Sequence, residues 1–212
     1  MKTKNLLLIF TRNPELGKVK SRLAKDVGDL TALNIYKDLL AHTKHIAQQT
    51  NADRFVFYTE RIEENDLWPT SDFNKFVQSH GDLGQKMKNA FEFGFQSGYE
   101  NIIVIGSDIL ELNETIINTA FDLLENKDAV IGPAEDGGYY LLGLTKMIPD
   151  LFENKLWGTD SVFNSTTSDL DKLNQNYTLL EVLNDIDYVT DIKDSNMILK
   201  YNLESYNKEK TC

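Results

Sequence analysis

The alternation of short apolar runs with longer amphipathic segments constrains the fold of this chain more than any other feature. Residues 6–11 (LLLIFT) and 101–105 (NIIVI) have the length and apolar character of strands buried on both faces of a parallel sheet. Between them, residues 30–47 carry apolar side chains at helical spacing, which predicts an amphipathic helix. Because strand and helix alternate through the first 130 residues, the pattern predicts right-handed βαβ units and an α/β fold.

The length of the chain and its remaining elements are consistent with a single α/β domain. A chain of 212 residues is long enough for one well-packed α/β domain and short for two. We therefore expect one domain over residues 1–205 and a flexible polar tail over 206–212. The remaining expected elements are strands at 54–59, 75–78, 129–131 and 139–144, and helices at 83–95, 116–124 and 190–203.

The charge and cysteine content weigh against several classes of function. A formal net charge of −11 opposes nonspecific binding to nucleic acid or to an anionic membrane, so any phosphate must be bound by local cations. No apolar window approaches the ~20 residues of a membrane helix, and the apolar run at 6–10 is too short for a signal-peptide core. The single cysteine, Cys212, leaves no intramolecular disulfide and no cysteine-based metal site, which fits a cytoplasmic protein.

A basic loop, RNPELGKVKSR, follows the first predicted strand. It contains Gly17, which lets a ligand approach the backbone, and four cations: Arg12, Lys18, Lys20 and Arg22. Loops in this position lie at the carboxyl edge of an open α/β sheet, where ligands bind. Arginine and lysine bind phosphate well, although the P-loop pattern GxxxxGK[ST] is absent. The loop indicates a phosphate site, with a solvated basic turn as the alternative.

Two acidic segments are candidates for a divalent metal site. Asp108 follows a buried strand in GSDIL, at the same expected edge, and carboxylate oxygens are ligands that hard divalent cations prefer. In NDIDYVTD, Asp185 and Asp187 alternate with an apolar residue and would point the same way in an extended chain, so one of them would complete a site with Asp108. The alternatives are a cap at Asp108 and acids at the start of the last helix, where Asp191 also suits the first turn.

The segment GPAEDGGYYLLGL places acids and glycines between two apolar runs. The acids are Glu135 and Asp136, the glycines Gly137 and Gly138, and the tyrosines that follow Tyr139 and Tyr140. Buried carboxylates are costly and glycine loses the most backbone freedom on folding, so a functional cleft would explain both. The glycines would let the chain turn beside a ligand, the acids would bind or activate an acceptor, and the tyrosines would point to opposite faces. A plain surface turn is the alternative.

The histidines and Trp157 are weaker candidates for a functional site, because each has a plausible structural role. His42 and His45 lie three residues apart on a predicted helix and His80 is distant in sequence, which is a poor zinc pattern. We expect these histidines at the surface or partly packed. Trp157, in LWGTD, is expected in the core, with stacking on a base or sugar as the alternative.

Six segments occur in an order that resembles a known family: TRNPELGKVKSRLA, GDLGQKM, IIVIGSDIL, GPAEDGGYYLLGL, LWGTDSV and DIDYVTD. From about residue 5 to 200, the chain is similar to bacterial proteins of unknown function described as glycosyltransferase-A-like or nucleotide-diphospho-sugar-transferase-like. Typical members read approximately K-x-P-x-x-G-x-V-K-T-R-L near the start and G-P-A-x-D-G-G-Y-Y-L in the middle. Here Leu110 stands where proline is frequent, and Arg12 and Ser21 retain the charge and hydroxyl of the usual lysine and threonine. More distantly, the chain resembles the molybdenum-cofactor and phospholactate guanylyltransferases.

The resemblance implies a three-layer α/β/α domain with a mostly parallel, Rossmann-like sheet that binds a nucleotide or nucleotide sugar. In that superfamily, an Asp at the end of the central strand and a later Asp or Asn hold a divalent metal. These positions match Asp108 and Asp187, with Mg²⁺ or Mn²⁺ as the implied cofactor. Lys18, Lys20 and Arg22 match the part that receives the nucleotide phosphates.

The implied activity is transfer from a nucleotide-activated substrate to a small-molecule acceptor that the sequence does not identify. Glycosyl transfer is favoured, because Asp136 or Glu135 would supply a general base. Guanylyltransferase-like nucleotidyl transfer is the second hypothesis, and a non-catalytic nucleotide-binding protein is the third, since fold does not fix function. The sequence indicates no oligomeric state.

Overall fold

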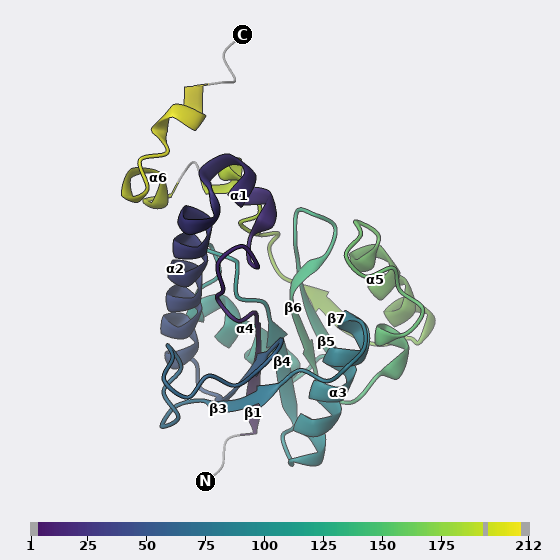
Figure 1. Ribbon diagram of the computed structural model, residues 1–212. Coiled ribbons are helices and arrows are strands. Elements are labelled where there is room, and N and C mark those ends of the chain that lie inside the picture. The colour runs from purple at the N-terminus through teal and green to yellow at the C-terminus, as the bar shows by residue number, and fades with distance from the viewer. Residues whose placement is uncertain (1–3, 193–194, 209–212) are drawn as a thin grey trace.

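A seven-stranded sheet forms the centre of the molecule (Figure 1). The structure, a computed structural model, describes residues 4–192 and 195–208. The strands lie in the order β3-β2-β1-β4-β6-β5-β7. Their bounds are β1 Asn5–Thr11, β2 Asp53–Tyr58, β3 Asn74–Val77, β4 Asn101–Ile105, β5 Ala129–Pro133, β6 Tyr139–Leu144 and β7 Tyr177–Leu179.

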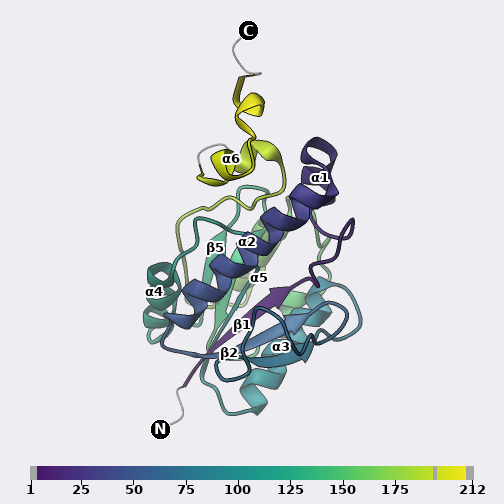
Figure 2. The same ribbon diagram turned by 60° about the vertical axis from the view of Figure 1, so that its left-hand side comes forward.

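Helices cover both faces of this sheet and complete three layers (Figures 1 and 2). The helices of the described chain are α1 Ser21–Val27, α2 Asp29–Gln48, α3 Leu83–Gln96, α4 Glu114–Leu124, α5 Val162–Lys172 and α6 Met197–Lys200, with short 3-10 helices η1 Pro149–Phe152, η2 Val189–Ile192 and η3 Glu204–Lys208. One core cluster joins α2 and α4 to the sheet, and a second joins α3 and α5 to its other face. The α/β/α architecture implied by the sequence is therefore confirmed.

β1 explains why the central strands are continuous apolar runs in the sequence. Leu7 and Ile9 pack on the α2 and α4 side, Leu6 and Leu8 pack on the α3 side, and all four side chains are fully buried. A strand covered on both faces leaves no position where a polar side chain would meet water. β1 pairs in parallel with β2 and with β4, as the βαβ pattern predicts.

β6 runs antiparallel to both of its neighbours, β4 and β5. The other strand pairs among the described residues are parallel, so the sheet is mostly parallel. At the start of β6, Tyr140 packs on the α2 and α4 side and Tyr139 packs on the α3 side, as the alternation of a strand requires. Gly132 in β5 leaves room for the Tyr140 ring, because a Cβ there would lie 2.4 Å from the ring carbon Cζ.

The prediction of one helix over residues 190–203 is wrong. The described part of this segment forms η2 and α6 as separate short turns, and residues 193–194 lie outside the described chain. Asp191 accepts hydrogen bonds from the amides of Asp187 and Tyr188, which is how an Asp side chain competes with helical hydrogen bonds. The helical spacing of apolar residues arises because Ile192 and Ile198 both pack against α1 and α2.

Other elements have weak signals in the sequence. α1, α5 and β7 were not predicted: α5 buries only Val162, Thr166 and Leu170, and β7 has three residues, too few for a strand pattern. Residues 209–212 of the expected flexible tail, including Cys212, lie outside the described residues. Among the helices that the structure describes, none is long and apolar enough to cross a membrane.

Candidate active site

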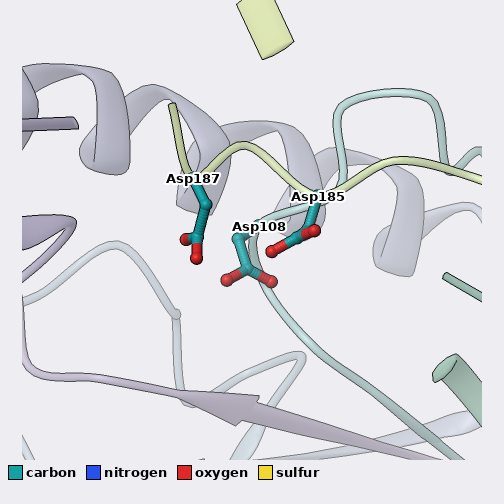
Figure 3. A group of neighbouring side chains, drawn as sticks. All are labelled: Asp108, Asp185 and Asp187. Atoms are coloured by element: carbon teal, nitrogen blue, oxygen red, sulfur yellow. The ribbon is translucent and has the colours of Figure 1, made fainter. Parts of the chain in front are cut away.

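Three aspartates meet at the carboxyl edge of the sheet (Figure 3). Asp108 follows β4, and Asp185 and Asp187 lie on the segment that leads from β7 to η2. Each offers one carboxylate oxygen, and these three oxygens all lie within 4.8 Å of one another. The structure thus brings together the two predicted metal ligands and adds Asp185, which the sequence pattern offered only as an alternative to Asp187.

A backbone contact joins these two distant segments. The amide of Ile186 donates to the carbonyl oxygen of Asp108 at 3.0 Å. The Ile186 side chain is buried against α1 and α2, so its neighbours on either side, Asp185 and Asp187, both face Asp108 (Figure 3). The alternation of acids around one apolar residue was therefore the signal for the site, although the packing that anchors that residue is not visible in the sequence.

The ammonium of Lys20 lies among these carboxylates. Its Nζ is 2.8 Å from Oδ2 of Asp108 and 3.0 Å from Oδ1 of Asp187, and its side chain is only 5% exposed. Arg22 adds a second cation, with Nη1 2.8 Å from Oδ2 of Asp187. Lys20 itself has φ of 47°, a backbone conformation that non-glycine residues seldom adopt and that occurs often at functional sites. The start of α1 therefore holds a cation at the acidic cluster.

Lys20, Asp187 and Asp185 have shifted pKa values, each for a different balance of causes. Burial lowers the pKa of the Lys20 ammonium, but the adjacent carboxylates outweigh it and leave the pKa raised. Burial also acts to raise the pKa of Asp187, yet Lys20 and Arg22 outweigh it and the pKa is lowered. For Asp185, burial and the neighbouring carboxylates raise the pKa to about 6. Of Asp185 and Asp187, Asp185 is therefore the acid whose negative charge is less compensated.

This donor set suits a hard divalent cation. Mg²⁺ and Mn²⁺ prefer carboxylate oxygens, and three such groups converge here. The ammonium of Lys20 within the cluster shows that positive charge is favourable at this position. Asp108, Asp185 and Asp187 thus fit a metal of the kind that the resemblance implied.

A polar pocket of about 580 Å³ opens beside Lys20, at the ends of β1 and β4. Four cations line it: Arg12, Lys20, Arg22 and Lys86. Three acids, Asp82, Asp108 and Asp187, line it as well, so the cations exceed the acids by one. In a protein with a net charge of −11, such a concentration of cations is suited to contact a phosphate group. Lys86, on α3, was missed by the sequence analysis, because it lies far along the chain from the basic loop and belongs to an ordinary amphipathic helix.

The basic loop divides into two parts. Three of its cations line the polar pocket, whereas Lys18 and Gly17 lie outside the pocket lining. Nζ of Lys18 lies 2.6 Å from Oε2 of Glu15, and the Lys18 side chain is more than half exposed. The charge of Lys18 is therefore met by a carboxylate outside the pocket.

An apolar pocket of about 220 Å³ lies beyond Asp108, which lines both pockets. Its walls include Phe10, Met87, Tyr139 and Trp157. Asp108 therefore lies at the junction between a cation-lined cavity and an apolar one, and a ligand that spans both would pass the carboxylate cluster.

The EDGG segment contributes Asp136 and Gly138 to the apolar pocket, whereas Glu135 is exposed and lies outside both pocket linings. Oδ1 of Asp136 accepts a hydrogen bond from the amide of Gly138 at 2.8 Å, which closes the turn. Gly137 has φ of 85°, and a Cβ there would lie 2.3 Å from the Asp160 carbonyl oxygen. Glycine is therefore required at 137 by both conformation and packing.

The described histidines lie outside the two pockets, whereas Trp157 lines one of them. No histidine lines either pocket, and Nε2 of His42 lies 2.7 Å from the carbonyl oxygen of Leu112, as in a packed structural residue. Trp157, in contrast, lines the apolar pocket while also packing against the second core cluster. Its position therefore combines the core role that we expected with access to a ligand.

The fold and the site together define a class: the chain has the fold shared by nucleotide-diphospho-sugar transferases and cytidylyltransferases. A protein of Desulfovibrio desulfuricans G20, proposed to be a nucleotide-diphospho-sugar transferase, is 29% identical with a TM-score of 0.83, over 97% of this chain and 95% of that chain. The chain belongs to the family described as "Uncharacterized protein conserved in bacteria (DUF2064)", whose model matches residues 41–159. The resemblance noted in the sequence is thereby confirmed.

Two further solved structures share the fold at low sequence identity. CMP:2-keto-3-deoxy-manno-octonic acid synthetase, complexed with CTP, is 10% identical with a TM-score of 0.57, over 97% of this chain and all of that chain (100%). Rv0371C of Mycobacterium tuberculosis H37Rv, in complex with manganese, is 12% identical with a TM-score of 0.55, over 90% and 96% of the two chains. A comparison with curated proteins gives no match in sequence.

Proposed function

We propose that this protein is a metal-dependent transferase that acts on a nucleotide-activated substrate, with glycosyl transfer from a nucleotide sugar as its reaction. One observation carries the proposal: the three carboxylates lie at the junction between a cation-lined pocket and an apolar pocket. The phosphates of a nucleotide sugar would lie in the cation-lined pocket, which would bring the anomeric carbon to the carboxylates and leave the apolar pocket beyond them for the acceptor. The likeness to a protein proposed to be a nucleotide-diphospho-sugar transferase supports the same reaction.

In this proposal Asp108, Asp185 and Asp187 hold Mg²⁺ or Mn²⁺. When bound, the metal would neutralise phosphate charge and favour departure of the nucleoside diphosphate. Lys20 would release its carboxylates to the metal and, with Arg12, would contact phosphate oxygens that the metal does not reach. Lys86 and Arg22 complete the cationic lining, whereas Lys18 has no role in it.

Asp136 is the proposed general base for the transfer. It lines the apolar pocket together with Asp108, and its carboxylate is exposed enough to meet an acceptor. The acceptor hydroxyl would lose its proton to Asp136 as its oxygen forms a bond to the anomeric carbon of the sugar. The bond between that carbon and the phosphate oxygen breaks, and the nucleoside diphosphate leaves with the electron pair.

Nucleotidyl transfer is the second candidate, because the fold is also that of a cytidylyltransferase-type enzyme complexed with CTP. In that reaction an acceptor phosphate attacks the α-phosphorus of a nucleoside triphosphate and pyrophosphate leaves. A non-catalytic nucleotide-binding protein is the third candidate. The released product distinguishes all three.

The test is to incubate the protein and Mg²⁺ or Mn²⁺ with nucleotide sugars or nucleoside triphosphates, together with a mixed acceptor pool, and to measure the released products. Glycosyl transfer predicts a nucleoside diphosphate, and nucleotidyl transfer predicts pyrophosphate. D108N should abolish release of either product, whereas D122N, at an exposed carboxylate on α4, should not. Release of neither product from any donor, in the presence of metal, would contradict both catalytic proposals.

A further inference from the structure

The apolar pocket differs sharply in charge from the polar pocket beside it. Its charged lining residues are Asp108, Asp136 and Asp185, and no lysine, arginine or histidine lines it in the part of the chain that the structure describes. The polar pocket, in contrast, is lined by four cations as well as by Asp82, Asp108 and Asp187. Donor phosphates in the polar pocket would therefore have cations within reach, whereas an anionic acceptor in the apolar pocket would be repelled.

The difference in charge between the two pockets should persist when a metal fills the carboxylate cluster, because Asp136 lies outside that cluster. A divalent cation held by the carboxylate cluster would compensate charge on Asp108 and Asp185, which lie in that cluster. Asp136 is not a member of the cluster, and no cation pairs with it among residues 4–192 and 195–208. Its hydrogen-bond partner is the amide of Gly138, and the carboxylate lines the pocket.

Aromatic side chains form part of the wall of the apolar pocket. Trp157 and Tyr139 line it, and both also pack against the core below α3. Gly84, in the first turn of α3, lets the indole lie against the helix backbone, because a Cβ there would be 2.4 Å from Nε1 of Trp157. An indole held in this way is a preformed face for stacking, particularly for a ring with polarised C–H groups or a positive charge.

We propose that the apolar pocket receives an acceptor ring that is neutral or cationic and carries no phosphate or carboxylate. This inference rests on the proposed function and deepens it, since it assigns a substrate class to one half of the site. A hydroxylated ring of this kind would stack on Trp157 and direct its hydroxyl to Asp136. A phosphorylated acceptor, as in the nucleotidyl transfer considered above, would place its charge against that carboxylate.

The test uses the fluorescence of Trp157 and three matched probes: phenyl β-glucoside, its phosphate monoester, and its primary-amine analogue. Excess pyrophosphate and Mg²⁺ fill the polar pocket, so a probe phosphate gains no cations there. The neutral and amine probes should change the fluorescence and the phosphate probe should bind at least about tenfold more weakly. The W157F variant should lose the signal, because the other tryptophan, Trp68, is buried in the core.

A second variant separates charge from shape. D136N retains an oxygen that accepts from the Gly138 amide, so the turn should persist. Its preference for the amine probe over the neutral probe should fall by about tenfold, and its discrimination against phosphate should fall likewise. Tighter binding of the phosphate probe than of the neutral probe, or no signal from any probe, would overturn the proposal. These binding results do not depend on turnover, so they can fail while transfer activity is present.

Discussion

The raised pKa of Asp185 links the acidic cluster to the stability of the protein. Its pKa of about 6 lies above the ordinary value of 3.8, because burial and neighbouring carboxylates oppose its ionisation. Between these two pH values the folded protein holds a proton that the unfolded chain has lost. The contribution of Asp185 to the stability of the metal-free protein should therefore fall as pH rises from about 4 to about 6.

The prediction is that D185N removes this loss. In EDTA, the thermal midpoint of the wild type should fall across that pH range relative to D185N, because an amide carries no proton that folding retains. Asp187 has the opposite shift, so its contribution is lost as pH falls below the ordinary value and does not overlap this window. D122N serves as the control. Equal pH slopes for the wild type and D185N would contradict the assignment of Asp185 to the acidic cluster.

At the residue scale, the sequence indicated which residues could form the site, but not which of them contact one another. Asp108, Lys20 and Arg22 were named from their types and positions, and Asp187 was chosen over Asp185 by the resemblance. The structure brings these four residues within contact distance. Lys18 looked equivalent to Lys20 in the sequence, but Lys18 pairs with Glu15 outside the pocket. The difference arises because Lys20 adopts a positive φ at the start of α1, and no periodicity in the sequence reveals that conformation.

At the scale of elements, α3 positions the wall of the apolar pocket through its first turn. Gly84 allows Trp157 and the Phe152 carbonyl to approach the helix, and a Cβ there would lie 2.4 Å and 2.5 Å from Nε1 and this oxygen. Backbone oxygen cannot rotate away as a flexible side chain can. G84A should therefore destabilise the protein by about 1–3 kcal/mol, measured by urea unfolding.

A change in α3 that avoids this contact is the control. Gln85 is exposed, and Q85A should alter stability by less than about 0.5 kcal/mol. Because the indole must shift to admit a methyl group, G84A should also alter the fluorescence of Trp157, whereas Q85A should not. A G84A protein with wild-type stability and emission would show that the α3 turn does not position this wall.

The elements that the sequence predicted share a simple physical origin. β1 and β4 are covered on both faces, so burial produces an unbroken apolar run. α5 and β7 lie at the edge of the molecule with few buried side chains, so their burial leaves little pattern. The helix predicted over residues 190–203 shows that a pattern can also mislead. Its apolar residues have helical spacing, but they pack against α1 and α2 from short separate turns.

At the scale of the whole molecule, the site depends on chain topology. The segment after β7 passes beside β5, with Ala134 bridging Leu183, before it reaches Asp108 at the end of β4. The C-terminal turns then pack on α1 and α2, where Ile198 and Leu203 join the same cluster as Leu39. This return supports our proposal that residues 1–205 act as one domain. Local sequence patterns carry no information about such a return, so Asp185 was undervalued.

Calorimetric titration with Mn²⁺, in the presence of a nucleoside diphosphate, tests most directly whether the three carboxylates form a metal site for nucleotide phosphates. The wild type and D122N should bind the metal and nucleotide together. D108N and D187N should weaken that binding by at least about tenfold, because each removes one ligand from the cluster. Wild-type affinity in both D108N and D187N would contradict the account of this site.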